Sequence, residues 1–179
     1  MREIEIKVRI NDLNKLRQTL KAQDVILSEP IKQHDRVWGE PGGKDAVLNV
    51  NWLRIRTEND KKYIFTLKKS IVGHLDSIEH ETNIENVVEL ENIIKELRYE
   101  AYSDIVKIRE KARIGDIEIC IDEVPGLGNF IEAEMMTDID ANHDEVIAEL
   151  WKKLIEFGLN KNDEVHEGYD VLERRQRGL

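Results

Sequence analysis

The first ten residues alternate strictly between apolar and charged side chains, and this pattern constrains the fold more than any other feature. The even positions from Ile4 to Ile10 are apolar, and the odd positions from Glu3 to Arg9 carry two acids followed by two bases. A period of two predicts a β-strand with one face buried in an apolar layer. A charged face on a single strand is also typical of a solvated edge strand. The rest of the chain therefore decides between these two readings.

The same alternation recurs along most of the sequence. Seven further strands are predicted over residues 25–38 (interrupted near Pro30), 50–57, 62–69, 78–84, 104–113, 117–124 and 129–137. Short turns such as Gly115-Asp116 predict hairpins and hence a mainly antiparallel sheet. About eight strands are apolar on one side and charged on the other. A sheet whose charged face is simply exposed to solvent explains this recurrence poorly.

Three amphipathic helices are predicted between the strands, and a fourth, short helix is predicted in the tail from Asp163 onward. Their apolar stripes contain Leu13, Leu16 and Leu20 in the first helix, Val87, Leu90, Ile94 and Leu97 in the second, and Ile147, Leu150, Trp151 and Leu154 in the third. Such helices need an apolar surface to cover. We therefore predict one α+β domain over residues 1–179, an antiparallel eight-stranded closed tunnel barrel with helices packed on the outside.

The charged strand faces would line the inside of this barrel. The predicted lumen contains the acids Glu3, Glu5, Glu79, Glu81, Asp122, Glu132 and Glu134 and the bases Lys7, Arg9, Arg54, Arg56, Lys68, Lys107, Arg109, Lys111 and Arg113. Buried ion pairs are weak stabilisers because desolvation offsets their attraction. A lumen of this kind suits the joint binding of a polyanion by Lys and Arg and of hard divalent cations by carboxylates.

Composition limits the other classes of function. The net charge of −10 argues against a nucleic-acid-binding protein, which is usually basic. The single cysteine excludes an internal disulfide. No signal-peptide pattern and no apolar run of membrane-spanning length occurs, so we expect a cytoplasmic protein without a membrane partner.

Several other features favour a structural interpretation. The loop Gly39–Lys44 lacks the Ser or Thr that follows the lysine of a phosphate-binding glycine loop, and we predict a plain turn region. The five histidines are scattered without ligand spacing. Cys120 has no evident activating base, which favours a small neutral filler. The three tryptophans are expected to pack, although Trp38 falls near one end of the predicted tunnel.

The order and spacing of these charged motifs resemble those of the CYTH superfamily, also called triphosphate tunnel metalloenzymes. Glu3-Ile-Glu5-Ile-Lys7 resembles the N-terminal ExExK signature of this family. The further motifs are Gln33-His-Asp35 with Trp38, Leu53-Arg54-Ile55-Arg56, Thr66-Leu-Lys68, Lys107-Ile-Arg109, Asp122 and Gly126-Leu127-Gly128, and Phe130-Ile-Glu132-Ala-Glu134. The resemblance extends over nearly the whole chain. Two positions differ from the pattern, because Asp76-Ser77 stands where members often have an arginine, and Tyr169-Asp-Val-Leu172 matches the ending of close cyclase relatives only loosely.

The resemblance implies a set of site residues and cofactors. Implied metal ligands for Mg²⁺ or Mn²⁺ are Glu3, Glu5, Glu79, Glu81, Glu132 and Glu134. Implied phosphate-binding residues are Lys7, Arg54, Arg56, Lys68, Lys107 and Arg109. The residues expected to be catalytic are Glu5, Lys7, Asp122 and Glu134. Relatives are often homodimers, which makes a homodimer the expectation here.

Three functions remain open at this point, and the resemblance of the Gln33/Asp35 element and of the segment around Glu132 and Glu134 favours the first. The first is a class IV adenylate cyclase, a phosphorus-oxygen lyase that converts ATP to cyclic AMP and pyrophosphate. The second is a triphosphatase that hydrolyses the terminal phosphate of inorganic or thiamine triphosphate. The third is a non-catalytic module that binds nucleotides or polyphosphate. The first two need the same charged clamp, and no adenine pocket is evident in the sequence. Both acid pairs, Glu3/Glu5 and Glu132/Glu134, argue against the third.

Overall fold

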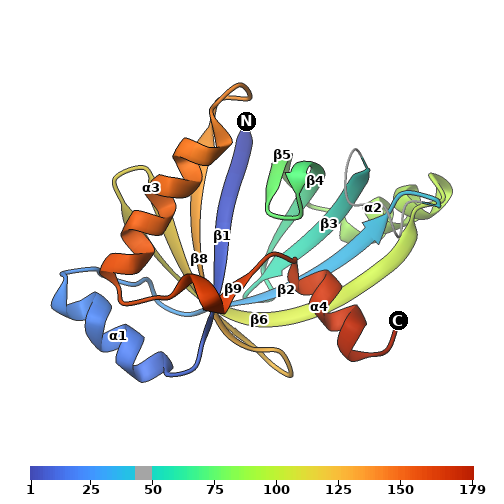
Figure 1. The fold of residues 1–179 in the computed structure, drawn as a ribbon. Coiled ribbons are helices and arrows are strands. Elements are labelled where there is room, and N and C mark those ends of the chain that lie inside the picture. The colour runs from blue at the N-terminus through green and yellow to red at the C-terminus, as the bar shows by residue number, and fades with distance from the viewer. Residues whose placement is uncertain (43–49) are drawn as a thin grey trace. The chain divides into compact units, whose positions relative to one another are not determined.

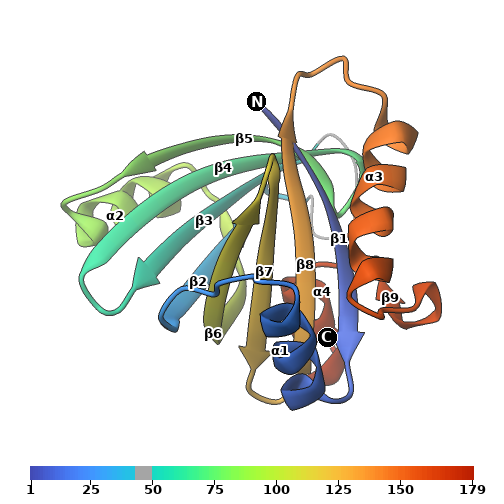
Figure 2. The ribbon, with the colours of Figure 1, turned by 90° about the vertical axis from the view of Figure 1, so that its left-hand side faces the viewer.

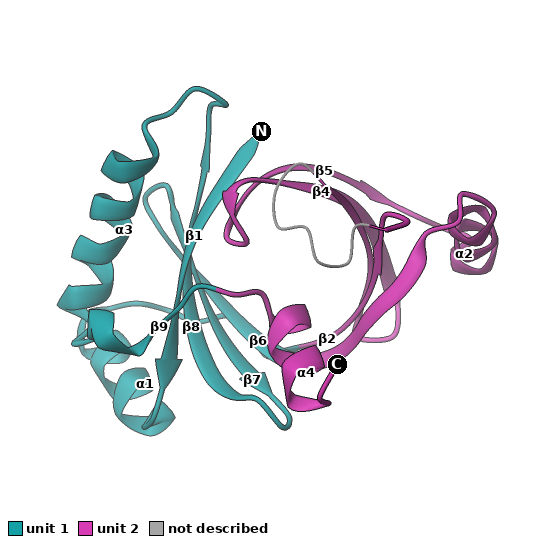
Figure 3. Ribbon diagram, turned by 45° about the vertical axis from the view of Figure 1, so that its right-hand side comes forward, with its two compact units in different colours: residues 1–31, 107–166 teal, residues 32–106, 167–179 magenta. Residues whose placement is uncertain are grey.

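The computed structural model of the chain describes residues 1–42 and 50–179, and they form an α+β protein. Part of the turn region predicted at residues 39–44 lies outside the described residues. The chain divides into two compact units (Figure 3). Unit 1 contains residues 1–31 and 107–166, and unit 2 contains residues 32–106 and 167–179.

The sheet of unit 1 is antiparallel. Its strands are β1 (Arg2–Ile10), the second half of β6 (Glu100–Ile114), β7 (Ile117–Val124), β8 (Gly128–Thr137) and the two-residue β9 (Glu164–Val165), in the order β6-β7-β8-β1-β9. The register between β1 and β8 places Glu5 opposite Glu134 and Lys7 opposite Glu132. The two acid-bearing motifs at opposite ends of the sequence therefore lie directly beside each other.

Helices α1 (Leu13–Ala22) and α3 (His143–Glu156) cover the apolar face of this sheet (Figures 1 and 2). Asp12 caps α1 by accepting a hydrogen bond from the Lys15 amide, and Asn142 caps α3 in the same way through the Asp144 amide. The core between helices and strands includes Ile4, Ile6, Val8, Leu16, Leu20, Ile119, Ile131, Leu150 and Leu154. The short 3-10 helix η1 (Lys161–Asp163) then leads into β9.

Unit 2 repeats this design with different elements. Its strands β2 (Ile31–Gly39), β3 (Asn51–Glu58), β4 (Lys62–Gly73) and β5 (Asp76–Asn83) pair antiparallel in the order β5-β4-β3-β2, and the first half of β6 also belongs to it. Helix α2 (Val87–Glu96) packs on the apolar face through Val87, Leu90 and Ile94. Helix α4 (Tyr169–Gln176) is the short tail helix that the sequence predicts.

The predicted α+β class, with antiparallel strands and with helices against their apolar faces, is confirmed. Three details of the prediction are wrong. The strand predicted from Val25 begins at Ile31, because Pro30 has no N–H to donate, and Val25 instead packs against the core of unit 1. The strand β9 was not expected. Leu97, assigned to the apolar stripe of the second helix, is 58% exposed just beyond the end of α2. None of the helices in the described residues has the length and apolar character that crossing a membrane requires.

Candidate active site

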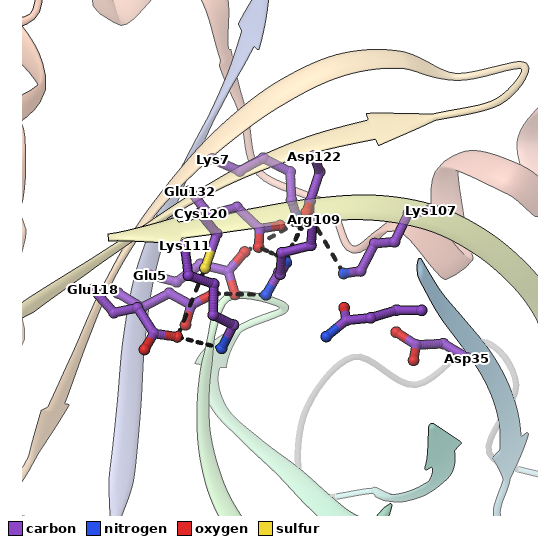
Figure 4. Close-up of polar contacts among 12 residues, drawn as sticks. Glu5, Lys7, Asp35, Lys107, Arg109, Lys111, Glu118, Cys120, Asp122 and Glu132 are labelled. Carbon is purple, nitrogen blue, oxygen red and sulfur yellow. Dashed lines mark hydrogen bonds and ion pairs between the residues drawn. The ribbon is translucent and has the colours of Figure 1, made fainter. Parts of the chain in front are cut away.

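The polar face of unit 1 gathers charged side chains from four neighbouring strands. Because residues on a strand alternate between faces, the isoleucines of β1 and β7 enter the core and the residues between them share the opposite face. The members of this cluster that Figure 4 labels are Glu5 and Lys7 from β1, Lys107, Arg109 and Lys111 from β6, Glu118, Cys120 and Asp122 from β7, and Glu132 from β8. Glu134, also from β8, is the tenth member. Most of them are buried.

Arg109 forms the centre of this cluster. Its Nε and Nη2 atoms donate to the two carboxylate oxygens of Asp122, at 2.7 and 2.5 Å, and Nη2 also pairs with Glu132. A longer contact of 3.4 Å joins its Nη1 atom to Glu134. Burial opposes the charged guanidinium, but Asp122 and Glu132 outweigh it, so the pKa of Arg109 is raised well above its ordinary value. Arg109 is therefore a fixed positive charge between three carboxylates.

Two lysines complete the buried ion pairs. The Lys7 ammonium lies 3.1 Å from Glu5 and 3.2 Å from Glu132, and its side chain is 2% exposed. Burial opposes its charge, but these two carboxylates outweigh the burial and raise the pKa of Lys7 above its ordinary value. Lys107 lies 3.4 Å from Asp122. Burial likewise opposes ionisation of Asp122, yet Lys107 and Arg109 prevail and lower the pKa of this carboxyl.

Three carboxylates converge beside these cations. Oxygen atoms of Glu5, Glu132 and Glu134 all lie within 4.8 Å of one another. Burial, together with the negative charge of Glu3, raises the pKa of Glu134 well above its ordinary value. A carboxylate whose charge is disfavoured in this way gains from a nearby cation. Oxygen donors of this kind and spacing are those that Mg²⁺ and Mn²⁺ prefer, so these residues fit a divalent metal ion.

Glu118 and Cys120 also lie within ligand distance of Glu134, although the sequence did not indicate them as metal ligands. Glu118, Cys120 and Glu134 form a second group whose donor atoms lie within 4.8 Å of one another, and Lys111 pairs with Glu118 at 2.6 Å. Burial raises the pKa of the Cys120 thiol far above its ordinary value, which keeps it neutral and unreactive. The alternation of β7 already places Glu118 on the face of Asp122, and this was the signal available in the sequence.

A pocket opens at the end of this polar face, and it is lined by Glu3, Arg113, Asp116, Glu118, Glu134 and Met136. Glu3 and Glu134 belong to both the pocket and the predicted metal ligands. The pocket therefore borders Glu134, one of the three converging carboxylates.

Unit 2 carries its own polar cluster on β3, β4 and β5. The Lys68 ammonium lies 2.8 Å from Glu79, and the Arg54 guanidinium lies 3.6 Å from Glu79 and 3.9 Å from Glu81. The register aligns these residues, with Lys68 opposite Glu79 and Arg54 opposite Thr66. Four of the predicted site residues are thus neighbours within this unit.

Arg56 has a tighter partner within the same unit. It donates through Nε and Nη2 to both carboxylate oxygens of Asp35, each at 2.7 Å, and it is 8% exposed. This bidentate pair joins the Gln33-His-Asp35 motif on β2 to the arginine-bearing strand β3. Asp35 therefore fixes the orientation of the Arg56 guanidinium through two charge-assisted hydrogen bonds.

Trp38 and Trp52, the two tryptophans on strands, have different surroundings. Trp38 lies in the core with Leu53, Ile55 and Ile94 of α2 and is 9% exposed, which confirms that it packs. Trp52 shares a face of β3 with Arg54, and its ring centroid lies 4.5 Å from that of Tyr102.

A family model and a full-length relative both match this chain. The CYTH domain matches residues 1–169. A protein of Methanocaldococcus jannaschii named "putative adenylate cyclase" is 32% identical over 181 residues, which cover the whole of both chains.

Solved structures share the fold. A conserved hypothetical protein of Pyrococcus furiosus superposes with a TM-score of 0.81 at 24% identity, covering 95% of this chain and 99% of that one. A protein of Hippeastrum, described as a "putative adenylyl cyclase" with a dominant triphosphatase activity, has a TM-score of 0.64 at 18% identity, with 99% and 96% coverage. The domain match and the full-length relative together show that this chain belongs to the CYTH family.

Proposed function

We propose that the protein is a metal-dependent enzyme that acts on a triphosphate, and that its reaction is the conversion of ATP to cyclic AMP and pyrophosphate. One observation carries this proposal, namely the three converging carboxylates of Glu5, Glu132 and Glu134 beside the buried cations Lys7 and Arg109. Carboxylates and bases in alternation suit a ligand that combines metal ions with phosphate groups. The name of the archaeal relative also supports the cyclase.

The proposed metal ligands are Glu3, Glu5, Glu132 and Glu134 in unit 1, and Glu79 and Glu81 in unit 2. A bound Mg²⁺ or Mn²⁺ would supply positive charge that offsets the phosphate charge in the transition state. The raised pKa of Glu134 supports its assignment, because a metal ion removes the repulsion that disfavours its ionised form.

The proposed phosphate-binding residues are Lys7, Lys107 and Arg109 in unit 1, and Arg54, Arg56 and Lys68 in unit 2. Each of them pairs with a carboxylate. These pairs keep the cations charged and oriented before the substrate arrives. Asp122, which holds Arg109 through two hydrogen bonds, contributes to catalysis by fixing that guanidinium.

In the proposed reaction the ribose 3′-oxygen of ATP attacks the α-phosphorus. The bond from that phosphorus to the oxygen bridging the α- and β-phosphates breaks, pyrophosphate leaves, and the hydroxyl proton is released to solvent. Lys and Arg residues bind the phosphate oxygens and hold the reacting atoms in line. A positioning role of this kind needs no covalent intermediate.

A triphosphatase is the second candidate, in which water attacks the terminal phosphorus and orthophosphate leaves. One specific finding favours it, because the structurally similar Hippeastrum protein is described as having a dominant triphosphatase activity. The same clamp of carboxylates and bases serves both reactions. The difference depends on whether the ribose 3′-hydroxyl or a water molecule occupies the attacking position.

Product analysis separates these candidates. The purified protein would be incubated with ATP, and separately with inorganic triphosphate, in the presence of Mg²⁺ or Mn²⁺ at neutral and alkaline pH. Cyclic AMP with pyrophosphate is the expected outcome from ATP. Orthophosphate without cyclic nucleotide would replace the cyclase with the triphosphatase. Metal-dependent binding without turnover would leave a nucleotide- or polyphosphate-binding module.

A further inference from the structure

Thr66 lies in the middle of the polar cluster of unit 2, and neither a metal nor a phosphate role has been assigned to it above. Thr66 belongs to β4, the middle one of the three strands β3, β4 and β5, which lie side by side (Figure 2). Its side chain has no exposed surface. The register places it between Arg54 on β3 and Glu81 on β5. A buried hydroxyl in an otherwise ionic row needs partners, because an unpaired polar group is costly to bury.

The Thr66 hydroxyl connects the two charged residues on either side. Arg54 donates from Nη2 to the hydroxyl oxygen at 3.1 Å, and the hydroxyl donates to a Glu81 carboxylate oxygen at 3.3 Å. A hydroxyl that donates to a carboxylate becomes a better acceptor, so the two hydrogen bonds strengthen each other. The direct contact between Arg54 and Glu81 is 3.9 Å and is therefore weak by comparison.

Arg54 is held in place but is incompletely paired. Within the described part of the chain, its buried Nε atom has no hydrogen-bond partner, and its contact with Glu79 is 3.6 Å. Arg56, two residues along the same strand, shows the contrasting case of a guanidinium bound by two hydrogen bonds to one carboxylate. The unpaired donor of Arg54 needs an acceptor, and a phosphate oxygen satisfies a guanidinium through charge-assisted hydrogen bonds.

We infer that Thr66 is a positioning residue, which orients the Arg54 guanidinium toward a phosphate oxygen of the substrate and couples it to Glu81. This inference rests on the proposed binding of a triphosphate. In this role Thr66 does not touch the reacting atoms. Its effect on binding acts through Arg54, and it should vanish when Arg54 is absent.

The test compares Thr66→Val, which removes the hydroxyl but keeps the side-chain volume, with Thr66→Ser, which keeps the hydroxyl. We expect Thr66→Val to raise KM for the triphosphate substrate at least about 10-fold, as loss of a hydrogen bond to a charged group predicts, with a smaller change in kcat. Thr66→Ser should restore most of the affinity. The matched control is Thr57→Val, because Thr57 is a half-buried threonine on the other face of β3.

A double-mutant cycle with Arg54→Ala shows whether the effect of Thr66→Val on KM depends on Arg54. In the Arg54→Ala background, Thr66→Val should change KM less than about twofold. Wild-type affinity in Thr66→Val, or full additivity with Arg54→Ala, would overturn the inference while leaving the proposed function intact. A wild-type protein that binds no triphosphate would overturn both. If Thr66→Val does not fold, Thr66→Ala removes the same hydroxyl and is subject to the same criteria.

Discussion

At the scale of single residues, the unusual property of this protein is the amount of charge that it buries. Lys7, Arg109 and Asp122 are at most 4% exposed. Each is bound to opposite charges, because an unpaired ion at this depth would destabilise the fold. Such pairs contribute little net stability, so a role in ligand binding accounts for them better than a role in folding.

Substitution of Glu5 should abolish metal-dependent turnover without unfolding the protein. Glu5→Gln keeps the size of the side chain but removes one of three converging carboxylate charges, so metal-dependent turnover should fall by at least about 100-fold. The far-ultraviolet circular dichroism spectrum should remain that of the wild type. Glu149→Gln, on the exposed side of α3, is the matched control. Full activity of Glu5→Gln would remove Glu5 from the metal site.

Glu134 gives a prediction about pH. Burial and Glu3 raise its pKa in the folded protein, so its ionised form disfavours folding once the pH exceeds the ordinary value of about 4.3. In the presence of EDTA, Glu134→Gln should therefore match the wild-type Tm near pH 4 and exceed it increasingly as the pH rises through the raised pKa. Adding Mn²⁺ should stabilise the wild type more than the variant.

Thermal unfolding followed at a series of pH values measures this difference. The opposite trend, in which Glu134→Gln becomes less stable than the wild type at alkaline pH without metal, would show that Glu134 is stabilised as an anion and would contradict the assignment.

Unlike the charge of Glu134, the charge of Asp122 should stabilise the folded protein, because Asp122 pairs with two cations. Asp122→Asn removes the charge that compensates Arg109 and Lys107 in the interior, and it should lower the free energy of unfolding by about 3–5 kcal/mol. Urea denaturation measures this change. Asp140→Asn, at an exposed position before α3, should change stability by less than about 0.5 kcal/mol. Equal effects of the two substitutions would mean that Asp122 is not needed to balance the buried cations.

At the scale of elements, alternation decides which face of each strand is polar. The period of two in residues 1–10 correctly assigned Ile4, Ile6 and Val8 to the core and Glu5 and Lys7 to the polar cluster. Strand β9 could not be predicted because two residues are too few to show a period. The start of β2 was misplaced because apolar residues before Pro30 can pack without forming a strand.

Helix α3 tests the interpretation that the helices exist to cover apolar strand faces. Leu150 is fully buried in the core of unit 1, whereas Ile155 on the same helix is 54% exposed. Leu150→Ala should lower the free energy of unfolding by about 2–5 kcal/mol, and Ile155→Ala by less than about 1 kcal/mol. Denaturant titration gives both values. Similar losses for the two variants would show that α3 does not pack through the face described.

At the scale of the whole molecule, the set of charged residues was predictable but the pairs among them were not. The sequence shows that Lys7 and Glu132 both lie on polar strand faces. Only the register between β1 and β8 brings them directly opposite each other, and this register depends on contacts between distant parts of the chain. Thr66 was missed for a related reason, since a threonine carries no charge signal and its importance comes from the neighbours on either side.

The net charge also has a consequence for binding. A protein of charge −10 repels a free triphosphate at long range, although its polar clusters contain Lys and Arg. A divalent cation lowers the negative charge of the substrate and of the carboxylates together. We therefore expect triphosphate binding and metal binding to reinforce each other.

The most direct measurement is calorimetric titration with a non-hydrolysable ATP analogue, with and without Mn²⁺, for the wild type and for Glu134→Gln. We predict that Mn²⁺ increases the affinity of the wild type for the analogue at least about tenfold, or roughly 1.4 kcal/mol, and that Glu134→Gln loses most of this increase. Equal affinity of the wild type with and without Mn²⁺ would contradict the proposal that the carboxylates of Glu5, Glu132 and Glu134 bind the metal ion of a metal triphosphate.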